Sequence, residues 1–206
     1  MSKYIIHACP ERMWYVERFL APSLRAQGIE PIIWNDSQRL GNLDSCMHCF
    51  RDIEGDAWHL QDDVIICRDF AKRTQEHDSG IVCGYCWENG VRKVPGVVKV
   101  TEMWWSFPCI RIPGQYAKEC AEWFYSTQHH VLWRAEKKYD DSFFKEFIET
   151  FYPTIDILNL RPTLVDHIDF LIGGTIVNKL RPEKETRAKW FDDIDLVEEL
   201  RRKLHG

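Results

Sequence analysis

Two adjacent carboxylates, Asp62 and Asp63, closely follow an apolar segment that is predicted to be a strand, residues 57–60. Like charges at close range repel and burial penalises each of them, so such a pair needs a compensating partner. A divalent cation is the usual partner, because carboxylate oxygens suit Mg²⁺ or Mn²⁺ and these ions also neutralise phosphates. The pair therefore predicts a metal site that carries a phosphate-bearing ligand. The alternative is that both side chains cap a loop or the next helix.

The segments that precede this pair are expected to place it at one edge of a sheet. Apolar residues recur with the spacing of a strand or a helix, in alternation, over residues 3–8, 11–27, 30–34, 43–53 and 57–60. This β-α-β-α-β order implies a parallel sheet with crossover helices, and ligands of such sheets bind beyond the carboxyl ends of the strands. Three polar segments fall there: the loop after Ala8, the pair Asn35 and Asp36, and the pair Asp62 and Asp63.

The rest of the chain continues with strands and helices. Further strands are predicted over residues 81–87, 97–104 and 110–112, and a β-rich stretch from 155 to 168. Further helices are predicted over residues 69–77, 115–126, 140–151 and 193–204. With 206 residues, no internal repeat and no clear linker, the chain is expected to form one α/β domain.

The composition excludes several classes of protein. Hydrophobic residues make up 45% of the chain and charged residues 29%, which is enough apolar surface for a sizeable core. A formal net charge of -5 argues against non-specific coating of nucleic acid, which needs many lysines and arginines. No run approaches the roughly 18 apolar residues of a membrane span, and the first residues do not form an export signal. We therefore expect a cytoplasmic protein without membrane contact, whose eight cysteines are reduced thiols.

The order of these elements, with one strand ending in an Asn-Asp pair and the next in Gln61-Asp62-Asp63-Val64, resembles the nucleotide-sugar domain of GT-A glycosyltransferases. The family's acidic motif usually begins with a carboxylate, and Gln61 stands at that position here. The resemblance implies a GT-A-like α/β fold, with a mixed, mainly parallel central sheet flanked by helices and a Rossmann-like N-terminal half.

The same resemblance divides the chain by function. It implies a single glycosyltransferase domain over residues 1–206, in which residues 1–100 bind the nucleotide sugar and residues 101–206 supply the acceptor site and the catalytic groups. The implied reaction is the metal-dependent transfer of a sugar from a nucleotide-sugar donor, a UDP-sugar above all, to a hydroxyl acceptor. The implied cofactor is Mn²⁺ or Mg²⁺.

The resemblance also implies the metal ligands. Asp63 takes the position that binds the metal on the donor diphosphate, and Asp62 orients the ribose or the metal-bound waters. Gln61 can bond a ribose hydroxyl or a metal-bound water through its amide. Residues 161–167 resemble the segment that brings a second ligand in several such enzymes, which makes His167 the candidate. A neutral imidazole suits Mn²⁺ better than Mg²⁺.

Asp140 and Asp141 begin a predicted helix and resemble the acidic pair that supplies the catalytic base in many GT-A enzymes. An inverting transferase needs such a base to take the proton of the acceptor hydroxyl. Asp141 is the expected base and Asp140 its supporting residue, whereas a retaining enzyme would not require either. The alternative is that both aspartates cap the helix and favour its dipole.

Contacts to the donor are expected from the first loop and from the end of the second strand. The backbone around Ala8 and Pro10 is expected to hold the base, and Asp36 to bond the base or the ribose. Arg39 is expected to reach the diphosphate, because a guanidinium matches two phosphate oxygens at once.

Two further segments bear on the acceptor. Residues 104–108, Trp-Trp-Ser-Phe-Pro, are expected either to form an acceptor platform or to belong to a buried aromatic cluster. The basic residues between Lys179 and Lys189 lie where a loop closes over the donor in the resembled fold, and they could also contact an acidic acceptor. The acceptor is expected to be a glycan or small molecule, or a hydroxymethylated DNA base as in some viral enzymes of similar fold.

Two other functions remain open from the sequence. The pairs Cys46/Cys49 and Cys83/Cys86 have the C-x-x-C spacing of a structural zinc site, so the chain could be a zinc-stabilised four-cysteine binding module without catalytic activity. A nucleotidyltransferase shares the acidic strand end. It usually has a Gly-rich phosphate loop after its first strand, and residues 7–12 do not form one.

Overall fold

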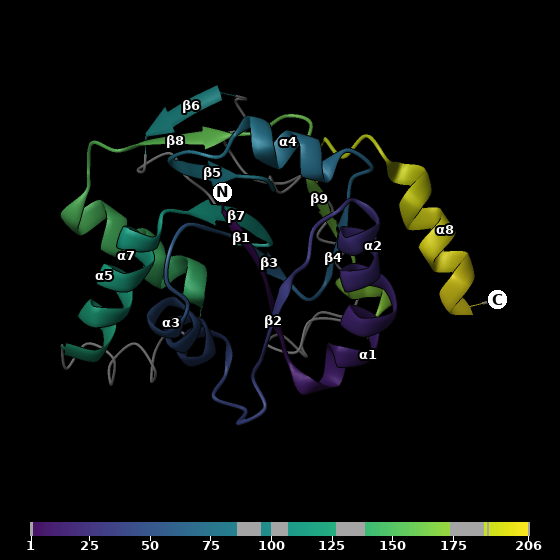
Figure 1. Ribbon diagram of the computed structural model, residues 1–206, viewed down its shortest axis with the longest axis horizontal. Coiled ribbons are helices and arrows are strands. Elements are labelled where there is room, and N and C mark those ends of the chain that lie inside the picture. Colours follow the sequence, from purple (N-terminus) through teal and green to yellow (C-terminus); the bar gives the residue numbers. More distant parts are fainter. Residues whose placement is uncertain are drawn as a thin grey trace.

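The computed structural model describes residues 2–85, 96–99, 107–126, 139–173, 188 and 190–205 (Figure 1). Its strands are β1 (Lys3–Ala8), β2 (Ile32–Asn35), β3 (Ala57–Gln61), β4 (Val64–Ile66), β5 (Ile81–Cys83), β6 (Gly96–Lys99), β7 (Cys109–Ile112), β8 (Asp156–Asn159) and β9 (Val165–His167). Its α-helices are α1 (Met13–Tyr15), α2 (Ala21–Ala26), α3 (Asn42–Asp52), α4 (Phe70–Glu76), α5 (Gly114–Ser126), α7 (Asp140–Phe151) and α8 (Ile194–His205). The short helices are η1 (Pro10–Arg12), the π-helix η2 (Val16–Leu20) and η4 (Asp169–Leu171).

The central sheet has the strand order β2-β1-β3-β7-β5-β8-β6. The strands β1, β2, β3, β5 and β8 run in one direction, and β7 and β6 run against them. The predicted α/β class with a mixed, mainly parallel sheet is therefore confirmed. The antiparallel insertion of β7 between β3 and β5 was not predicted. Every residue of β7 is buried, and a short strand that is buried throughout carries no signal of its direction.

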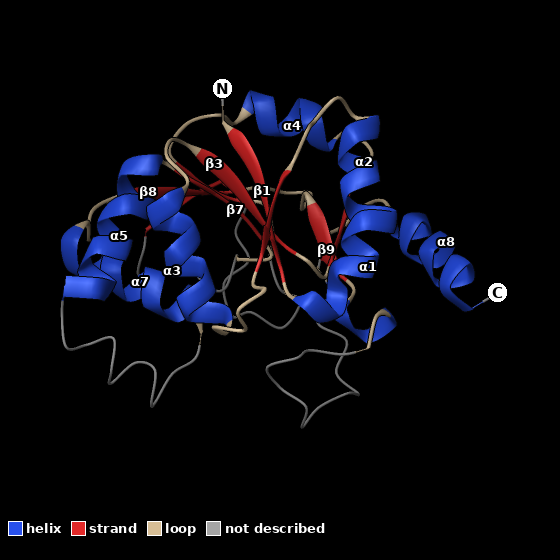
Figure 2. Ribbon diagram, turned by 60° about the horizontal axis from the view of Figure 1, so that its bottom comes forward, coloured by secondary structure: helices blue, strands red, loops and turns tan. Residues whose placement is uncertain are grey.

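Helices cover both faces of this sheet (Figure 2). On one face, Trp58 and Leu60 of β3 pack in a core cluster with side chains of α1, η2, α2, α4 and α8. On the other face, α3, α5 and α7 form a second core cluster against β5, β7 and β8. Alternate residues of β3 face opposite sides, so Ala57 packs toward α3 in a small third cluster. In the part of the chain that the structure describes, no helix combines the length and the apolar character that a bilayer crossing requires.

A second, two-stranded sheet joins β4 to β9 in antiparallel register. The register pairs Val64 with His167, and the backbone amide of Ile168 donates to the carbonyl of Asp63 at 2.8 Å. These bonds bring two parts of the chain that are about a hundred residues apart in sequence into direct contact at the edge of the central sheet. The small sheet therefore places His167 beside Asp63.

Gly84 lets the segment that leads into β9 dock on the end of β5. The amide of Gly84 donates to the carbonyl of Cys109, and the amide of Leu164 donates to the carbonyl of Gly84. A β-carbon on Gly84 would lie 2.7 Å from Cys109 Sγ and 2.9 Å from Leu164 Cδ1, which is closer than real contacts allow.

We therefore expect Gly84→Ala to destabilise the protein by about 1–3 kcal/mol, the usual cost of overpacking a buried site. Urea unfolding followed by circular dichroism measures this change. The double variant Gly84→Ala/Cys109→Ala removes the nearest clashing atom and should lose less stability than the sum of the two single changes. Strict additivity would show that the clash with Cys109 does not cause the loss.

Candidate functional site

A cavity of about 420 Å³ lies at the carboxyl ends of β1, β2 and β3. The register places the three ends side by side, because His7 pairs with Gln61 across one ladder and Ala8 pairs with Asn35 across the other. Every site residue predicted from the sequence lines this cavity: Ala8, Pro10, Asp36, Arg39, Gln61, Asp62, Asp63, Asp140, Asp141 and His167. The three strand ends meet at one pocket, as expected, and the start of α7 also lines this pocket.

Arg12, which the sequence reasoning did not select, holds the acidic pair together. Its Nη1 lies 2.9 Å from Asp62 Oδ1 and also contacts Asp63 Oδ2, and the side chains of all three residues are buried. The backbone amide of Cys9 donates to Asp62 Oδ2 at 2.8 Å. A guanidinium therefore supplies part of the positive charge that the two carboxylates need, and a metal ion would share them with Arg12.

Asp63 keeps one oxygen for another partner. Its Oδ2 lies 3.0 Å from His167 Nε2, whereas its buried Oδ1 has no hydrogen-bond partner among the residues that the structure describes. The other ring nitrogen of His167, Nδ1, lies 3.4 Å from Asp169 Oδ1. Both ring nitrogens of His167 therefore face carboxylates, and a metal ion at Nε2 would replace the contact of this nitrogen with Asp63 while Asp169 holds the other side of the ring.

The charges around Asp63 set the protonation of this group. Burial opposes ionisation of Asp63, but His167 and Arg12 hold its pKa well below the usual range. Burial alone would lower the pKa of His167, yet Asp63 and Asp169 raise it. Burial and the charge of Asp63 raise the pKa of Asp62 in spite of Arg12. Asp63 is therefore the carboxylate that stays ionised and is best able to bind a cation.

These residues fit a divalent metal ion. Asp63 offers an ionised carboxylate with an unsatisfied buried oxygen, and His167 offers a nitrogen beside it. The 3.0 Å between Asp63 Oδ2 and His167 Nε2 is the length of a hydrogen bond or ion pair, and the oxygen of Asp63 that is left for an ion is Oδ1. Because Arg12 contacts the same carboxylate, it competes with the ion for Asp63.

Asp140 and Asp141 begin α7 and face the same cavity. Asp140 Oδ1 accepts bonds from Asn42 Nδ2 at 2.8 Å and from the amide of Asp141 at 2.9 Å, and Asp141 Oδ1 accepts from the amide of Ser142 at 2.6 Å. Burial raises the pKa of Asp141 to about 6, and burial together with the charge of Asp141 raises the pKa of Asp140 to about 8. Asp140 and Asp141 accept hydrogen bonds from amides of the first helical turn, as the capping alternative expects. Asp141 is also a carboxyl group whose pKa lies near neutral pH.

The predicted donor contacts Asp36 and Arg39 line the same cavity. Asp36 accepts from the amides of Leu40 and Gly41 at 2.8 and 2.9 Å and so closes the loop after β2. Arg39 pairs with Glu11, and both side chains are exposed. The guanidinium of Arg39 therefore already has a carboxylate partner at the mouth of the cavity.

Some residues singled out in the sequence lie outside the described part of the chain: Trp104, Trp105, Ser106, Cys86, Lys179, Arg181, Lys184, Arg187 and Lys189. Phe107 is described, is 4% exposed and packs against the ring of Phe144. Of the two interpretations of residues 104–108, Phe107 supports the buried aromatic cluster.

The described cysteines of the two C-x-x-C pairs do not converge. Cys46 and Cys83 belong to the core cluster under α5 and α7, whereas Cys49 packs in the small cluster with Ile5 and Ala57. The described cysteines Cys46, Cys49 and Cys83 are free thiols, and they do not form a group that could share one ion. The four-cysteine zinc site is therefore not supported by these three residues.

Comparison of the sequence with protein-family models and with curated proteins finds no match. Any function must therefore be argued from the cavity and its side chains.

Proposed function

We propose that the protein is a metal-dependent glycosyltransferase with a GT-A-like fold, which moves a sugar from a nucleotide-sugar donor to a hydroxyl group. The observation that supports this proposal most strongly is the convergence of the predicted residues on one cavity. One cavity of about 420 Å³ is lined by groups from segments that lie far apart in the chain: the ends of β1, β2 and β3, the start of α7, and β9. A small-molecule site is expected at such a strand-end cavity with convergent polar groups and perturbed pKa values.

The balance of charge in the cavity supports the need for a metal ion. Carboxylates outnumber guanidinium groups along its walls, and Arg12 and Arg39 are both paired with carboxylates. A diphosphate entering this site would meet net negative charge, so its binding needs an added cation. Asp63 and His167 would hold Mn²⁺ or Mg²⁺, which when bound neutralises the diphosphate and stabilises its departure.

The residues of the chain have separable tasks in the transfer. Asp141 accepts the proton of the acceptor hydroxyl as that oxygen forms a bond to the anomeric carbon and the bond from this carbon to the diphosphate oxygen breaks. Asp140, held by Asn42, remains protonated near neutral pH and keeps negative charge away from Asp141. Arg12 fixes the rotamers of Asp62 and Asp63, and the loop closed by Asp36 forms the wall for the nucleoside. The acceptor is a glycan, a small molecule or a hydroxymethylated DNA base.

The proposal is tested by incubating the protein with Mn²⁺ and a panel of nucleotide sugars, UDP-sugars first. We expect release of nucleoside diphosphate with at least one donor, and a rise in melting temperature with Mn²⁺ and that nucleotide together. Asp63→Asn should reduce the release rate by about a hundredfold or more, the scale of losing one electrostatic contact to a departing group. The matched control is Asp52→Asn, because Asp52 lies at the end of α3, pairs with Arg51 and does not line the cavity.

A wild-type protein that shows neither nucleotide release nor thermal stabilisation with the whole panel would contradict the proposal. An active wild type whose rate is unaffected by Asp63→Asn would instead contradict the metal site while leaving a transferase in place.

A further inference from the structure

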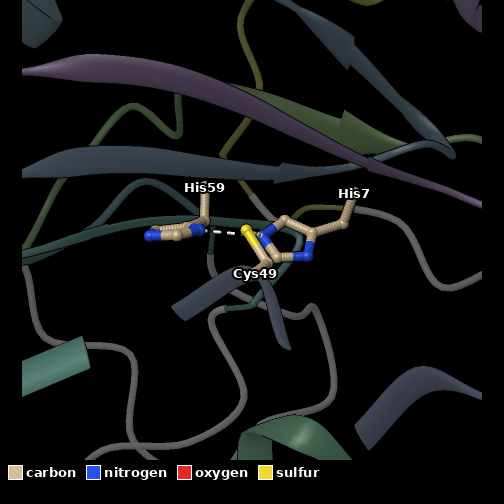
Figure 3. A group of neighbouring side chains, drawn as sticks. All are labelled: His7, Cys49 and His59. Atoms are coloured by element: carbon tan, nitrogen blue, oxygen red, sulfur yellow. Dashed lines mark hydrogen bonds between the residues drawn. The ribbon is translucent and has the colours of Figure 1, made fainter. Parts of the chain in front are cut away.

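Three side chains that the proposed transfer does not use lie beside one another, as Figure 3 shows, and one of them, His7, lines the cavity. His7 comes from β1, His59 from β3 and Cys49 from α3, and their nearest nitrogen and sulfur atoms all lie within 4.8 Å of one another. His7 Nε2 is 2.8 Å from His59 Nδ1, and Cys49 Sγ is 3.7 Å from His7 Nε2. Among the residues that the structure describes, this is the group of three or more histidines, cysteines and acids that is compact enough to share one ion.

The chemical state of these groups suits a metal ligand. Burial lowers the pKa of His7 to about 4, and burial together with His7 lowers the pKa of His59, so both rings are neutral and have a lone pair at pH 7. Cys49 and His59 are almost fully buried, and the edge of the Phe50 ring packs against His59. Two neutral imidazoles and one thiol are borderline-soft ligands, which select zinc over magnesium or manganese.

The observed separations are close to those of a tetrahedral zinc site. With zinc bonds of about 2.05 Å to nitrogen and about 2.3 Å to sulfur, tetrahedral ligands lie about 3.3 Å apart for two nitrogens and about 3.6 Å apart for nitrogen and sulfur. The distance of 3.7 Å from Cys49 Sγ to His7 Nε2 already agrees, and the two nitrogens at 2.8 Å need to separate by a fraction of an ångström. The ligand atoms of Cys49 and His59 lie within 4.8 Å of each other. The three ligands come from adjacent parallel strands and the helix packed on them, so a small shift of side chains suffices.

We propose that His7, Cys49 and His59 bind one Zn²⁺ ion, with a water molecule in the fourth position. Burial raises the pKa of the Cys49 thiol, so in the metal-free protein the thiol is protonated. Binding releases this proton to the solvent and forms the zinc–thiolate bond. One of the two imidazoles donates the hydrogen bond between His7 and His59. When the ion binds, the proton of this ring moves to its other nitrogen, so that the nitrogen facing the ion has a free lone pair.

The ion would act on the cavity through the elements that it joins. α3 carries Asn42, the partner of Asp140, and Ser45, and both line the cavity together with His7. A zinc ion on Cys49 ties α3 to β1 and β3 and so fixes the wall that holds Asp140. This site shares no ligand with the proposed Mn²⁺ site at Asp63 and His167, and it is independent of whether the protein transfers a sugar.

The test uses the full chain, treated with chelator and kept under a phosphine reductant. Equilibrium dialysis against Zn²⁺ should give at least one bound equivalent for the wild type, and Asp63→Asn, which loses a ligand of the other proposed site, should retain one equivalent. Co²⁺ used as a substitute should give a thiolate-to-metal charge-transfer band in the near ultraviolet. Cys49→Ala and His59→Gln should each weaken Zn²⁺ binding by more than about 100-fold and should remove the Co²⁺ band. Loss of a residue that only holds a metal ligand in place costs roughly 10–100-fold.

The controls separate this site from a four-cysteine site. Cys46→Ala and Cys86→Ser leave the proposed ligands in place, so both variants should keep the Zn²⁺ stoichiometry and the Co²⁺ band. Cys120→Ala removes a buried thiol away from the site and should also keep both. Circular dichroism identifies any variant that fails to fold, and the Co²⁺ spectrum of the wild type tests the thiolate ligand without any variant. The proposal is overturned if the wild type binds no Zn²⁺, if His59→Gln binds it as tightly as the wild type, or if Cys86→Ser abolishes binding.

Discussion

Replacement of Asp141 by asparagine is expected to lower kcat for sugar transfer by about 10²–10⁴-fold, the usual contribution of a general base. The side chain keeps its size and its bond from the amide of Ser142, so the start of α7 should be preserved. Asp141 is assigned no contact with the donor, so the affinity for nucleoside diphosphate with Mn²⁺ should not change. Initial rates at saturating donor and calorimetric titration of the nucleotide measure the two quantities separately.

The pH dependence of the same reaction reports the protonation of Asp141. Because the base must be ionised and burial raises its pKa to about 6, the rate should rise as pH increases through about 6 and level off above it. Asp141→Asn should lose this rise together with the activity. Asp156→Asn, in an exposed residue at the start of β8, is a control that should retain the wild-type profile.

A rate unchanged in Asp141→Asn would remove this residue from the reaction. It would also favour a retaining mechanism, which needs no such base, provided that Asp63→Asn still abolishes nucleotide release.

Most helices and strands could be predicted from the sequence, but the pairing of the strands could not. The bounds of β1 and α7 match the predicted ranges, because a short apolar run and an acidic first turn are local signals. The second strand begins at Ile32, two residues later than predicted, since Pro31 has no amide to donate to a ladder. Strand β9 lies in the predicted β-rich stretch 155–168, but β4 and its pairing with β9 were not predicted, because each strand has three residues and their pairing joins distant parts of the chain.

The composition of the cavity was predictable for a related reason. In a parallel sheet, the residues after successive strands must meet at one edge, so Asp36, Asp62 and Asp63 could be grouped from their positions alone. His167 required the resemblance to a known fold, since the ladder that brings it to Asp63 has no local signature. In residues 7–12, only the backbone around Ala8 and Pro10 was expected to contact the donor. Arg12, a basic residue in the same segment, is the partner of the acidic pair that the sequence reasoning did not select.

The histidine and cysteine cluster was missed for a different reason. The C-x-x-C spacing drew attention to Cys46 together with Cys49, but a buried site is formed by side chains that share a face of the sheet. His7 and His59 point from neighbouring strands toward the same helix. Side chains alternate between the two faces of a sheet, so the β1–β3 register is enough to place both rings on one face. That register is a long-range property, so the cluster could be recognised only in three dimensions.

Removal of the Arg12 side chain is expected to cause the largest loss of stability. Arg12→Met keeps much of the apolar stem but leaves Asp62 and Asp63 buried without their guanidinium partner. Breaking a buried ion pair in this way costs about 3–5 kcal/mol. For a chain of this length each kcal/mol corresponds to about 2–4 °C, so we expect the melting temperature to fall by about 6–20 °C. Differential scanning calorimetry in the presence of EDTA measures the change.

Addition of Mn²⁺ distinguishes a cation site from an ordinary ion pair. With Arg12 removed, a divalent ion no longer competes with a guanidinium for Asp63, so Mn²⁺ should raise the melting temperature of Arg12→Met more than that of the wild type. Arg25→Met is the matched control, because Arg25 also pairs with a carboxylate, Glu30, but both side chains are exposed and such pairs contribute about 0–1 kcal/mol. Equal and small losses in the two variants would show that the acidic pair does not depend on Arg12. A large loss that Mn²⁺ does not relieve would show that the carboxylates need a guanidinium and do not accept a metal ion in its place.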